Sequence, residues 1–483
     1  MLGSGSMIVT MRLLVASWTW AVALATYETR WFTQSLAHAA GDERTYDQRY
    51  LVNSTFWGKG ASPVFASSTC PGPVLFYSGN EGPIDAFWPG NGFMTDHLAP
   101  KWGAYVIMAE ARYYGASLPF GNGSWAPENL EWLTTELILA DYAALLRALQ
   151  KSELRGCPVV SFGGSYGGTL TTFFRLTYPD VVVGGLAASA PIGYYDKAHW
   201  ADHGVDAFTF SRIVARDYDD AAPGCLDAIA ATNAALNAAP AAALVDLFKL
   251  CDAAALGPTA QSNLFQYALE SLPQLDYPHA VGAIPAWPVN RTCALLLAAD
   301  ADGDRLAAAA EVTKIVLGTG SPDKCFAALV EGPGGVPGDG PGPDSWGYQS
   351  CTENLHEFSS DSKVRTYAFD LAAQTSLCES LFDDTAPDPT RLTELYGGYE
   401  IPAKVTNVIF SNGLLDPWHG GGFYPSDADD PSNVFCVMPN GAHHGDLRAP
   451  EPDDPADITA CRQLEEATIG TWLAAAAAAA TTA

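Results

Sequence analysis

The chain has 483 residues, of which 48% are hydrophobic, a composition typical of a globular protein and not of a disordered one. Its 54 acidic residues outnumber the 25 basic ones and give a formal charge of -29. Nucleic acids and anionic membrane surfaces are bound through basic patches, so this charge argues against both as partners. We interpret it as a solvated acidic surface. Adaptation to an acidic compartment is the alternative, because protonation there relieves repulsion between carboxylates.

The N-terminal region has the pattern of a signal peptide. Met11 and Arg12 form a basic start and are followed by a short apolar stretch that ends in small residues. This pattern predicts a signal peptide over residues 1–26, and no later apolar run is long enough to span a bilayer.

Two further features indicate the secretory pathway. Sequons at Asn53, Asn122 and Asn290 predict glycosylation, and ten cysteines suit an oxidising compartment. No two cysteines have C-x-x-C spacing, so zinc and redox motifs are not indicated. We expect a lysosome-like or vacuole-like location, or secretion.

Strands and helices alternate in the first part of the chain. Short apolar runs predict strands at 74–77, 105–109, 159–162 and 182–188. Leucines and other apolar residues at helical spacing predict a helix over 134–150. This alternation predicts an α/β fold with a parallel sheet covered on both faces.

A Gly-x-Ser-x-Gly pattern follows the third of these strands. Gly163 and Gly167 flank Ser165, and the next residues read as a helix. Between a strand and a helix this pattern predicts a nucleophile elbow, in which the serine stands exposed on a tight turn. Ser165 is therefore the candidate nucleophile.

The alternation then breaks between about residues 194 and 398. This region is Ala-rich, reads as helical, and contains six of the ten cysteines. The Gly- and Pro-rich stretch 331–344 predicts an exposed loop. We expect a helical insertion above the carboxyl ends of the strands, where open α/β sheets bind ligands.

Sheet-like patterns return at 405–411 and 433–438, and a closing helix is predicted at 458–473. A nucleophilic serine needs a histidine base and a carboxylate that orients it. Asp416 follows the first late strand, while His443 and His444 follow the second. The order Ser, Asp, His is that of the α/β-hydrolases, but spacing alone does not choose between the two histidines.

These residues resemble one peptidase family, which includes lysosomal Pro-X carboxypeptidase, dipeptidyl peptidase II and thymus-specific serine protease. The matching motifs occur in order along nearly the whole mature chain; they are Arg49-Tyr50, 77–82, 112–115, 117–121, 163–168, 346–353, 411–413, 416–418 and 441–444. The resemblance implies Ser165 as nucleophile, Asp416 as orienting carboxylate and His443 as base. It also implies an α/β-hydrolase core with an inserted, disulfide-bridged helical cap.

The resemblance and the composition together predict five segments. These are a signal peptide (1–26), the first part of the core (27–192), the cap (193–400), the second part of the core (401–475) and an Ala-rich tail (476–483).

The resemblance implies a disulfide between Cys351 and Cys378. Three pairings stay open for Cys225, Cys251, Cys293 and Cys325, and Cys70, Cys157, Cys436 and Cys461 have no assignment.

The expected reaction is acyl transfer, for which no metal or organic cofactor is needed. Backbone N–H groups of Tyr166 and of the Gly79–Asn80 turn are predicted to stabilise the oxyanion. The resemblance implies peptide substrates with proline near a terminus, and suggests a homodimer formed through the cap.

Two residues are candidates for substrate binding. Trp418 offers an aromatic wall for a proline ring, and Glu81 a carboxylate for a substrate ammonium. Release of X-Pro dipeptides is our first expectation, and release of the C-terminal residue from Pro-X is the alternative. An esterase of the same fold and a catalytically silent binding protein are more distant alternatives.

Overall fold

The computed structural model describes residues 27–59, 70–250, 263–302, 304–317, 345–383, 385–425 and 430–482. The predicted signal peptide and the predicted loop 331–344 lie outside these residues, as do Cys251 and Cys325.

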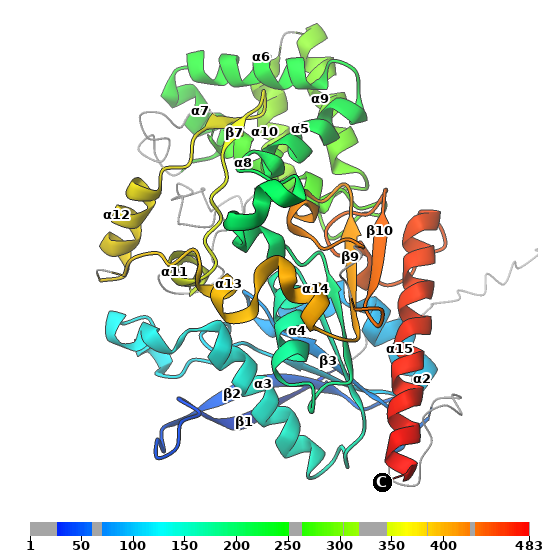
Figure 1. Cartoon of the computed structure of the whole chain (residues 1–483). Helices are drawn as coiled ribbons and strands as arrows, with labels where there is room; N and C mark the ends of the chain where they lie inside the picture. The colour runs from blue at the N-terminus through cyan, green and yellow to red at the C-terminus, as the bar shows by residue number, and fades with distance from the viewer. Residues whose placement is uncertain are drawn as a thin grey trace, which may run out of the picture.

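One mixed sheet of eight strands forms the centre of the molecule, in the order β1-β2-β4-β3-β5-β6-β9-β10 (Figure 1). The strands are β1 (Glu28–Ser35), β2 (Thr45–Asn53), β3 (Val74–Ser78), β4 (Tyr105–Ala109), β5 (Val159–Gly164), β6 (Gly184–Ala188), β9 (Val408–Gly413) and β10 (Val434–Met438). From β4 to β10 all neighbours are parallel, while β1, β2 and β4 pair antiparallel. The predicted α/β-hydrolase fold is confirmed, with the hairpin β1–β2 as an addition that the sequence patterns did not predict.

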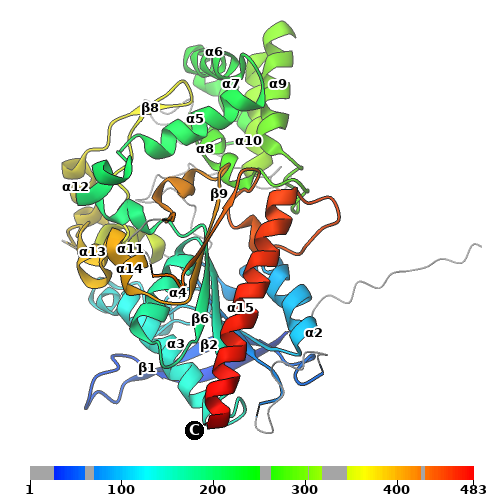
Figure 2. The same cartoon turned by 45° about the vertical axis from the view of Figure 1, so that its right-hand side comes forward.

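Alternate residues of the strands pack on opposite faces of the sheet. In β3, Val74 and Phe76 join the cluster that contains α3 (Thr135–Gln150) and α4 (Tyr166–Thr177), while Leu75 and Tyr77 join the one beneath α15 (Ala456–Thr482). Figure 2 shows α15 on one side of the sheet and α3 and α4 on the other. Burial on both faces explains why these strands read as continuous apolar runs.

Shorter helices complete the core; they are α1 (Ile84–Phe87), α2 (Ala99–Trp102), α13 (Arg391–Tyr396) and α14 (Ile401–Lys404). The closing helix α15 is longer than predicted, because the terminal alanines continue it to Thr482 instead of forming a separate tail. Alanine has the highest intrinsic helix propensity, so an alanine run readily extends a helix that is already nucleated.

The inserted helical region lies between β6 and β9 and stands over the sheet at the top of Figure 1. Its elements are α5 (Thr209–Ala221), α6 (Cys225–Ala238), α7 (Ala241–Phe248), α8 (Asn263–Ser271), α9 (Pro288–Asp302), α10 (Arg305–Leu317), α11 (Ser345–Thr352), α12 (Leu371–Leu381), β7 (Ser360–Asp361) and β8 (Thr366–Tyr367). Helices α5 to α10 share a hydrophobic cluster of their own. Among the described residues no single helix has the length and apolar character to cross a membrane; α6 and α7 pass that test only as a pair bent by 119°.

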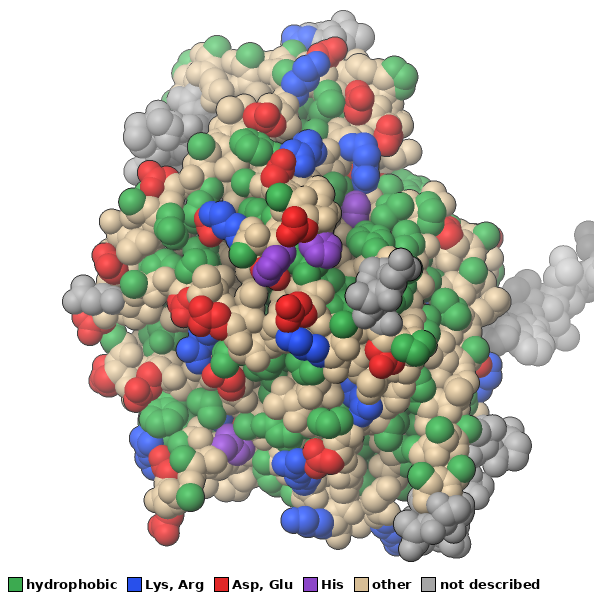
Figure 3. All heavy atoms as spheres, in the orientation of Figure 1, with side chains coloured by type: hydrophobic (Ala, Val, Ile, Leu, Met, Phe, Trp, Pro, Cys, Tyr) green, Lys and Arg blue, Asp and Glu red, His purple; other side chains and the backbone are tan. Residues whose placement is uncertain are grey.

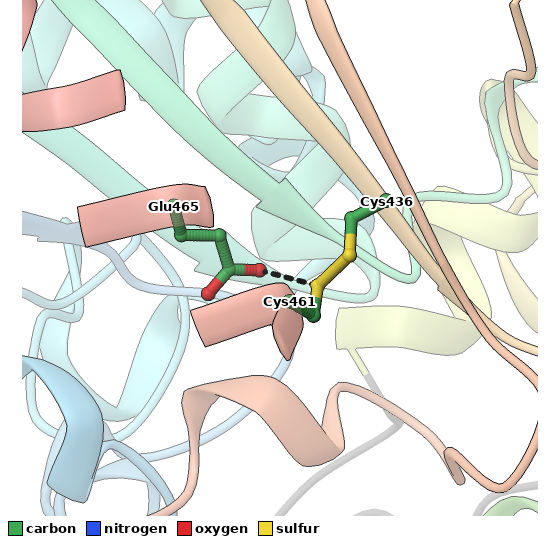
Figure 4. A group of neighbouring side chains, drawn as sticks. All are labelled: Cys436, Cys461 and Glu465. Atoms are coloured by element: carbon green, nitrogen blue, oxygen red, sulfur yellow. Dashed lines mark hydrogen bonds between the residues drawn. A yellow bond between two sulfur atoms is a disulfide. The ribbon is translucent and has the colours of Figure 1, made fainter. Parts of the chain in front are cut away.

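Each described disulfide lies within the core or within the inserted region. The described bonds are Cys70–Cys157, Cys225–Cys293, Cys351–Cys378 and Cys436–Cys461. The Cys351–Cys378 bond is the one that the family resemblance implied, and it links α11 to α12. The Cys436–Cys461 bond joins β10 to α15 (Figure 4).

Charged side chains are mixed with apolar ones on one face of the molecule. On the face shown in Figure 3, Lys and Arg side chains are scattered among acidic and apolar ones and form no continuous basic patch.

Candidate active site

Ser165 lies on a strained turn between β5 and α4. Its backbone has φ 59° and ψ -128°, outside the regions that L-residues usually adopt. Its N–H donates to the carbonyl of Ala188 (2.9 Å), and its carbonyl accepts from the N–H of Thr169 (3.0 Å). Strand β6 and the first turn of α4 thus hold the conformation, which is that of a nucleophile elbow.

The glycine at 163 is required by the close approach of helix and strand. A Cβ at Gly163 would overlap the backbone carbonyl of Gly167, which cannot move away without displacing α4. We expect Gly163→Ala to lower the free energy of unfolding by about 3 kcal/mol, measured by urea denaturation. Gly470→Ala in α15, where a Cβ meets nothing within 4 Å, is the control and should be neutral or slightly stabilising. Equal stabilities of the two variants would contradict this account of the elbow.

Asp416 and His443 come together at the carboxyl ends of β9 and β10. Nδ1 of His443 lies 2.7 Å from Oδ2 of Asp416. The carboxylate is fully buried and also accepts the N–H of Trp418 (3.1 Å). A carboxylate bound at Nδ1 places the ring proton there and leaves Nε2 as the proton acceptor.

His444 has a different environment. Burial holds its pKa well below the ordinary value, and the neighbouring His443 lowers it further. Its Nδ1 has no hydrogen-bond partner among the described residues, and its ring packs against Gly164, where a Cβ would lie 2.8 Å from Cδ2. The geometry therefore favours His443 as the base.

The cap holds the backbone of the His443 loop, which no sequence motif indicated. The N–H of His443 donates to the carbonyl of Gln274 (3.0 Å), and its carbonyl accepts from the Tyr277 hydroxyl (3.0 Å). The Gln274 side chain also accepts the indole N–H of Trp418 (2.8 Å). These cap residues lie beyond any recognisable motif in an Ala-rich region, so only the fold places them at the site.

The oxyanion prediction needs one correction. The N–H of Gly79 donates to the carbonyl of Ala109 (3.1 Å), because the pairing of β3 with β4 continues one residue past the end of the strand. Gly79 is therefore not a free donor, which leaves Asn80 as the other predicted donor of this turn. The Asn80 side chain bridges to the carbonyl of Gly164 (3.3 Å) and so fixes this turn beside the elbow.

Tyr166 is the second predicted oxyanion donor. It is the first residue of α4, and the first N–H groups of a helix have no acceptor within the helix. Its amide follows Ser165 directly, which is the position that supplies one donor in nucleophile-elbow hydrolases.

The two predicted substrate-binding residues lie near the Asp416–His443 pair. Burial raises the pKa of Glu81, and the charge of His443 acts against that rise, so the two groups are within electrostatic reach. One carboxylate oxygen of Glu81, Oε2, is buried and has no hydrogen-bond partner among the described residues.

Trp418 belongs to an aromatic cluster at the boundary of cap and core, formed by Tyr194, Phe210, His356, Phe358 and Trp418. Burial lowers the pKa of His356 to about 3, so this imidazole is neutral over the physiological range. The cluster is therefore an uncharged aromatic wall.

The sequons differ in accessibility. Asn122 and Asn290 are exposed, whereas Asn53 is 3% exposed and its side-chain oxygen accepts the N–H of Thr55 (2.9 Å). A glycan is bulky and needs an open surface, so the structure argues against the prediction for Asn53.

One group of potential metal ligands occurs among the described residues, at Cys436, Cys461 and Glu465 (Figure 4). Both sulfur atoms are in a disulfide and cannot act as thiolate ligands while it is intact. This group lies between β10 and α15, away from the elbow.

Comparison with known proteins identifies the family. A model of the family described as serine carboxypeptidase S28 matches residues 34–465. Lysosomal Pro-X carboxypeptidase of Mus musculus is 32% identical over 92% of this chain and 89% of its own. Thymus-specific serine protease of Mus musculus is 30% identical over 92% and 87%. Among solved structures, proline iminopeptidase of Mycobacterium smegmatis aligns with 93% of this chain and 100% of its own, at 14% identity and a TM-score of 0.36. The chain therefore belongs to the serine carboxypeptidase S28 family and is a serine-type peptidase.

Proposed function

We propose that Ser165, His443 and Asp416 are a catalytic triad that hydrolyses peptides after proline. The observation that carries the proposal is the 2.7 Å contact between His443 and the buried Asp416, at the same edge of the sheet as the elbow of Ser165. Nε2 of His443 takes the proton from Oγ of Ser165 while Oγ bonds to the scissile carbonyl carbon. The tetrahedral intermediate then collapses, His443 protonates the leaving amine, and water hydrolyses the acyl-enzyme.

Backbone N–H groups stabilise the negative charge that develops on the carbonyl oxygen. We assign this role to the N–H groups of Tyr166 and Asn80. Donors of this kind are worth roughly 3 kcal/mol each, because they point at the oxyanion before it forms.

A preference for proline rests on the aromatic cluster. The Trp418 backbone is bonded to Asp416 and its indole to the cap, so the ring is held beside the triad. A flat, uncharged proline ring packs well against such a wall, whereas a charged side chain would be desolvated there.

Glu81 supports the release of X-Pro dipeptides. Its unpartnered, buried oxygen near His443 suits the ammonium group of a substrate whose free N-terminus lies two residues before the scissile bond. Binding of the ammonium would satisfy this oxygen and compensate its desolvation. A substrate carboxylate at the same place would be repelled.

The second candidate is a carboxypeptidase that releases the residue after proline. It is favoured by the names of the relatives, which include Pro-X carboxypeptidases at 32% identity. Those relatives are called lysosomal, and the disulfides of this chain fit the secretory pathway. We propose an acidic, lysosome-like or vacuole-like compartment for this protein.

Two peptides at acidic pH distinguish the release of X-Pro dipeptides from carboxypeptidase activity. One has a free N-terminus followed by X-Pro; the other is blocked at its N-terminus and ends in Pro-X. We expect release of the X-Pro dipeptide from the first and little cleavage of the second. Release of the last residue from the blocked peptide alone would instead establish the carboxypeptidase, and cleavage of neither would contradict the preference for proline.

Glu81→Gln tests the proposed ammonium site. We expect kcat/KM for the free-amine peptide to fall about 100-fold, since one charge-assisted contact is worth about 3 kcal/mol. The same variant should label with a fluorophosphonate as fast as the wild type, because that probe carries no ammonium. Equal kcat/KM of variant and wild type would remove Glu81 from substrate binding.

A further inference from the structure

Two of the motifs described above have no part in the proposed triad. These are 112–115, which contains Tyr114, and 346–353, which contains Gln349 and Glu353. The fold brings both to the side chain of Tyr166, whose backbone amide is the proposed oxyanion donor.

Gln349 lies at the centre of a buried network. Its Nε2 donates to the hydroxyl of Tyr166 (2.9 Å) and to Oε1 of Glu353 (2.9 Å), and its Oε1 accepts from the hydroxyl of Tyr114. Gln349 is fully buried, and Tyr166 and Glu353 are nearly so. The amide thus uses both of its N–H donors and its carbonyl oxygen within the protein.

A second path leads from Tyr166 to Glu353 through Thr135. The Thr135 hydroxyl lies 2.9 Å from the Tyr166 hydroxyl and donates to Oε1 of Glu353 (2.6 Å), which also accepts the Thr135 N–H (2.9 Å). Where Glu353 is ionised, it accepts the Thr135 hydroxyl proton, so the Tyr166 hydroxyl then donates to Thr135 and accepts from Gln349.

This network joins three elements around the elbow. Thr135 and Tyr166 are the first residues of α3 and α4, and Gln349 is on α11. The disulfide Cys351–Cys378 anchors α11, and the ring of Trp346 packs 5.1 Å from that of Tyr166. The Tyr166 side chain is consequently fixed at its ring and at its hydroxyl.

We propose that Gln349 is a positioning residue for catalysis, which holds the Tyr166 side chain and thereby the amide that binds the oxyanion. This role rests on the proposed function of Ser165 and Tyr166. The physical reason is geometric: the donor must point at the oxygen before the charge forms, and a shift of about 1 Å in such a group can lower the rate about 100-fold. Ser165 and Tyr166 are adjacent on a strained turn, so greater mobility of the Tyr166 side chain also increases the mobility of the backbone at Ser165.

The test uses Gln349→Met, which keeps the volume but removes the donor and the acceptor, and Tyr166→Phe, which removes only the hydroxyl. We expect kcat to fall about 10-fold to 100-fold with KM within about twofold, and fluorophosphonate labelling of Ser165 to slow by the same factor. Because both variants remove the same hydrogen bond, the double variant should be little slower than the slower single one. Tyr166→Phe keeps the test decisive if Gln349→Met does not fold.

Tyr218→Phe is the matched control. The Tyr218 hydroxyl is equally buried and donates to the carbonyl of Leu269 within the cap, so its loss affects stability alone. A change in KM alone, or a loss of kcat and labelling rate below about threefold in folded variants, would overturn the positioning role. Wild-type protein that neither labels nor cleaves would instead overturn the proposed function, so the two failures are distinguishable.

Discussion

Replacement of Ser165 by alanine is expected to lower kcat by about 10⁴-fold to 10⁶-fold on any peptide that the wild-type protein cleaves. The hydroxyl is the atom that forms the acyl-enzyme, and without it the other groups can only assist attack by water. The Ser165 side chain caps no helix, so its loss should leave the melting temperature within a few degrees of the wild-type value.

Fluorophosphonate labelling provides the second measurement. The probe should label the wild-type protein once and fail to label Ser165→Ala. Ser152→Ala is the control, because Ser152 is an exposed serine at the end of α3, and it should retain both labelling and turnover. Full turnover in Ser165→Ala would end the triad proposal, and absence of labelling in the wild type would support a catalytically silent protein.

The second effect that we expect is a contribution of three buried carboxyl groups to stability at acidic pH. Burial raises the pKa of Asp217 and of Glu353 to about 7, and that of Asp276 to about 6. A carboxyl group with a raised pKa binds its proton more tightly in the folded than in the unfolded protein. It therefore contributes stability that is fully present below the unfolded pKa and is lost as the pH rises through the folded pKa.

The pH range of this contribution follows from these pKa values. Between about pH 4 and pH 7 the folded protein holds protons that the unfolded chain has released, so the free energy of unfolding falls as the pH rises. One pKa unit corresponds to about 1.4 kcal/mol for each group. The buried histidines oppose this trend up to about pH 6.5, because burial lowers the pKa of His356 to about 3 and that of His419 to about 4, so the unfolded chain binds protons there that the folded one does not. We therefore expect a fall in melting temperature of only a few degrees, between about pH 6.5 and pH 7.5, where the carboxyl groups alone still titrate. The negative charge of the whole chain acts in the same direction through self-repulsion.

Neutral replacements of these carboxyl groups test whether they cause the pH dependence of the melting temperature. Asp217→Asn and Asp276→Asn should each flatten the pH dependence and raise the melting temperature near pH 7.5, because they remove a buried charge. Glu379→Gln, at an exposed position on α12, should leave the pH profile unchanged. A melting temperature that rises with pH would show that other groups dominate. The expected direction fits a protein that works in an acidic compartment.

The sequence patterns were sufficient for the core and for Ser165 and Asp416 as candidates, and the family resemblance added the choice of His443 for the proposed triad. The strands β3, β4 and β5 are buried on both faces, so they appear as short apolar runs between helical patterns. The elbow needs glycine at fixed positions, and a chain order of Ser, Asp, His is visible without a structure. By contrast, the edge strand β1 exposes Trp31 and buries Gln34, so its sequence of polar and apolar residues does not follow its burial and predicts no strand.

Contacts between segments that are distant in the sequence could be identified only from the tertiary structure. The pairing of β3 with β4 occupies the Gly79 amide and so leaves only Asn80 of the two donors predicted in this turn. The contact of Asp416 with His443, the histidine that the resemblance implied, is seen only in the fold, and a carbonyl of the cap at Gln274 holds the His443 loop. The side chain of Gln349 reaches Tyr166 across 183 positions of sequence. Local patterns report propensity and burial, whereas hydrogen bonds between segments depend on how the elements pack, and no local pattern encodes that packing.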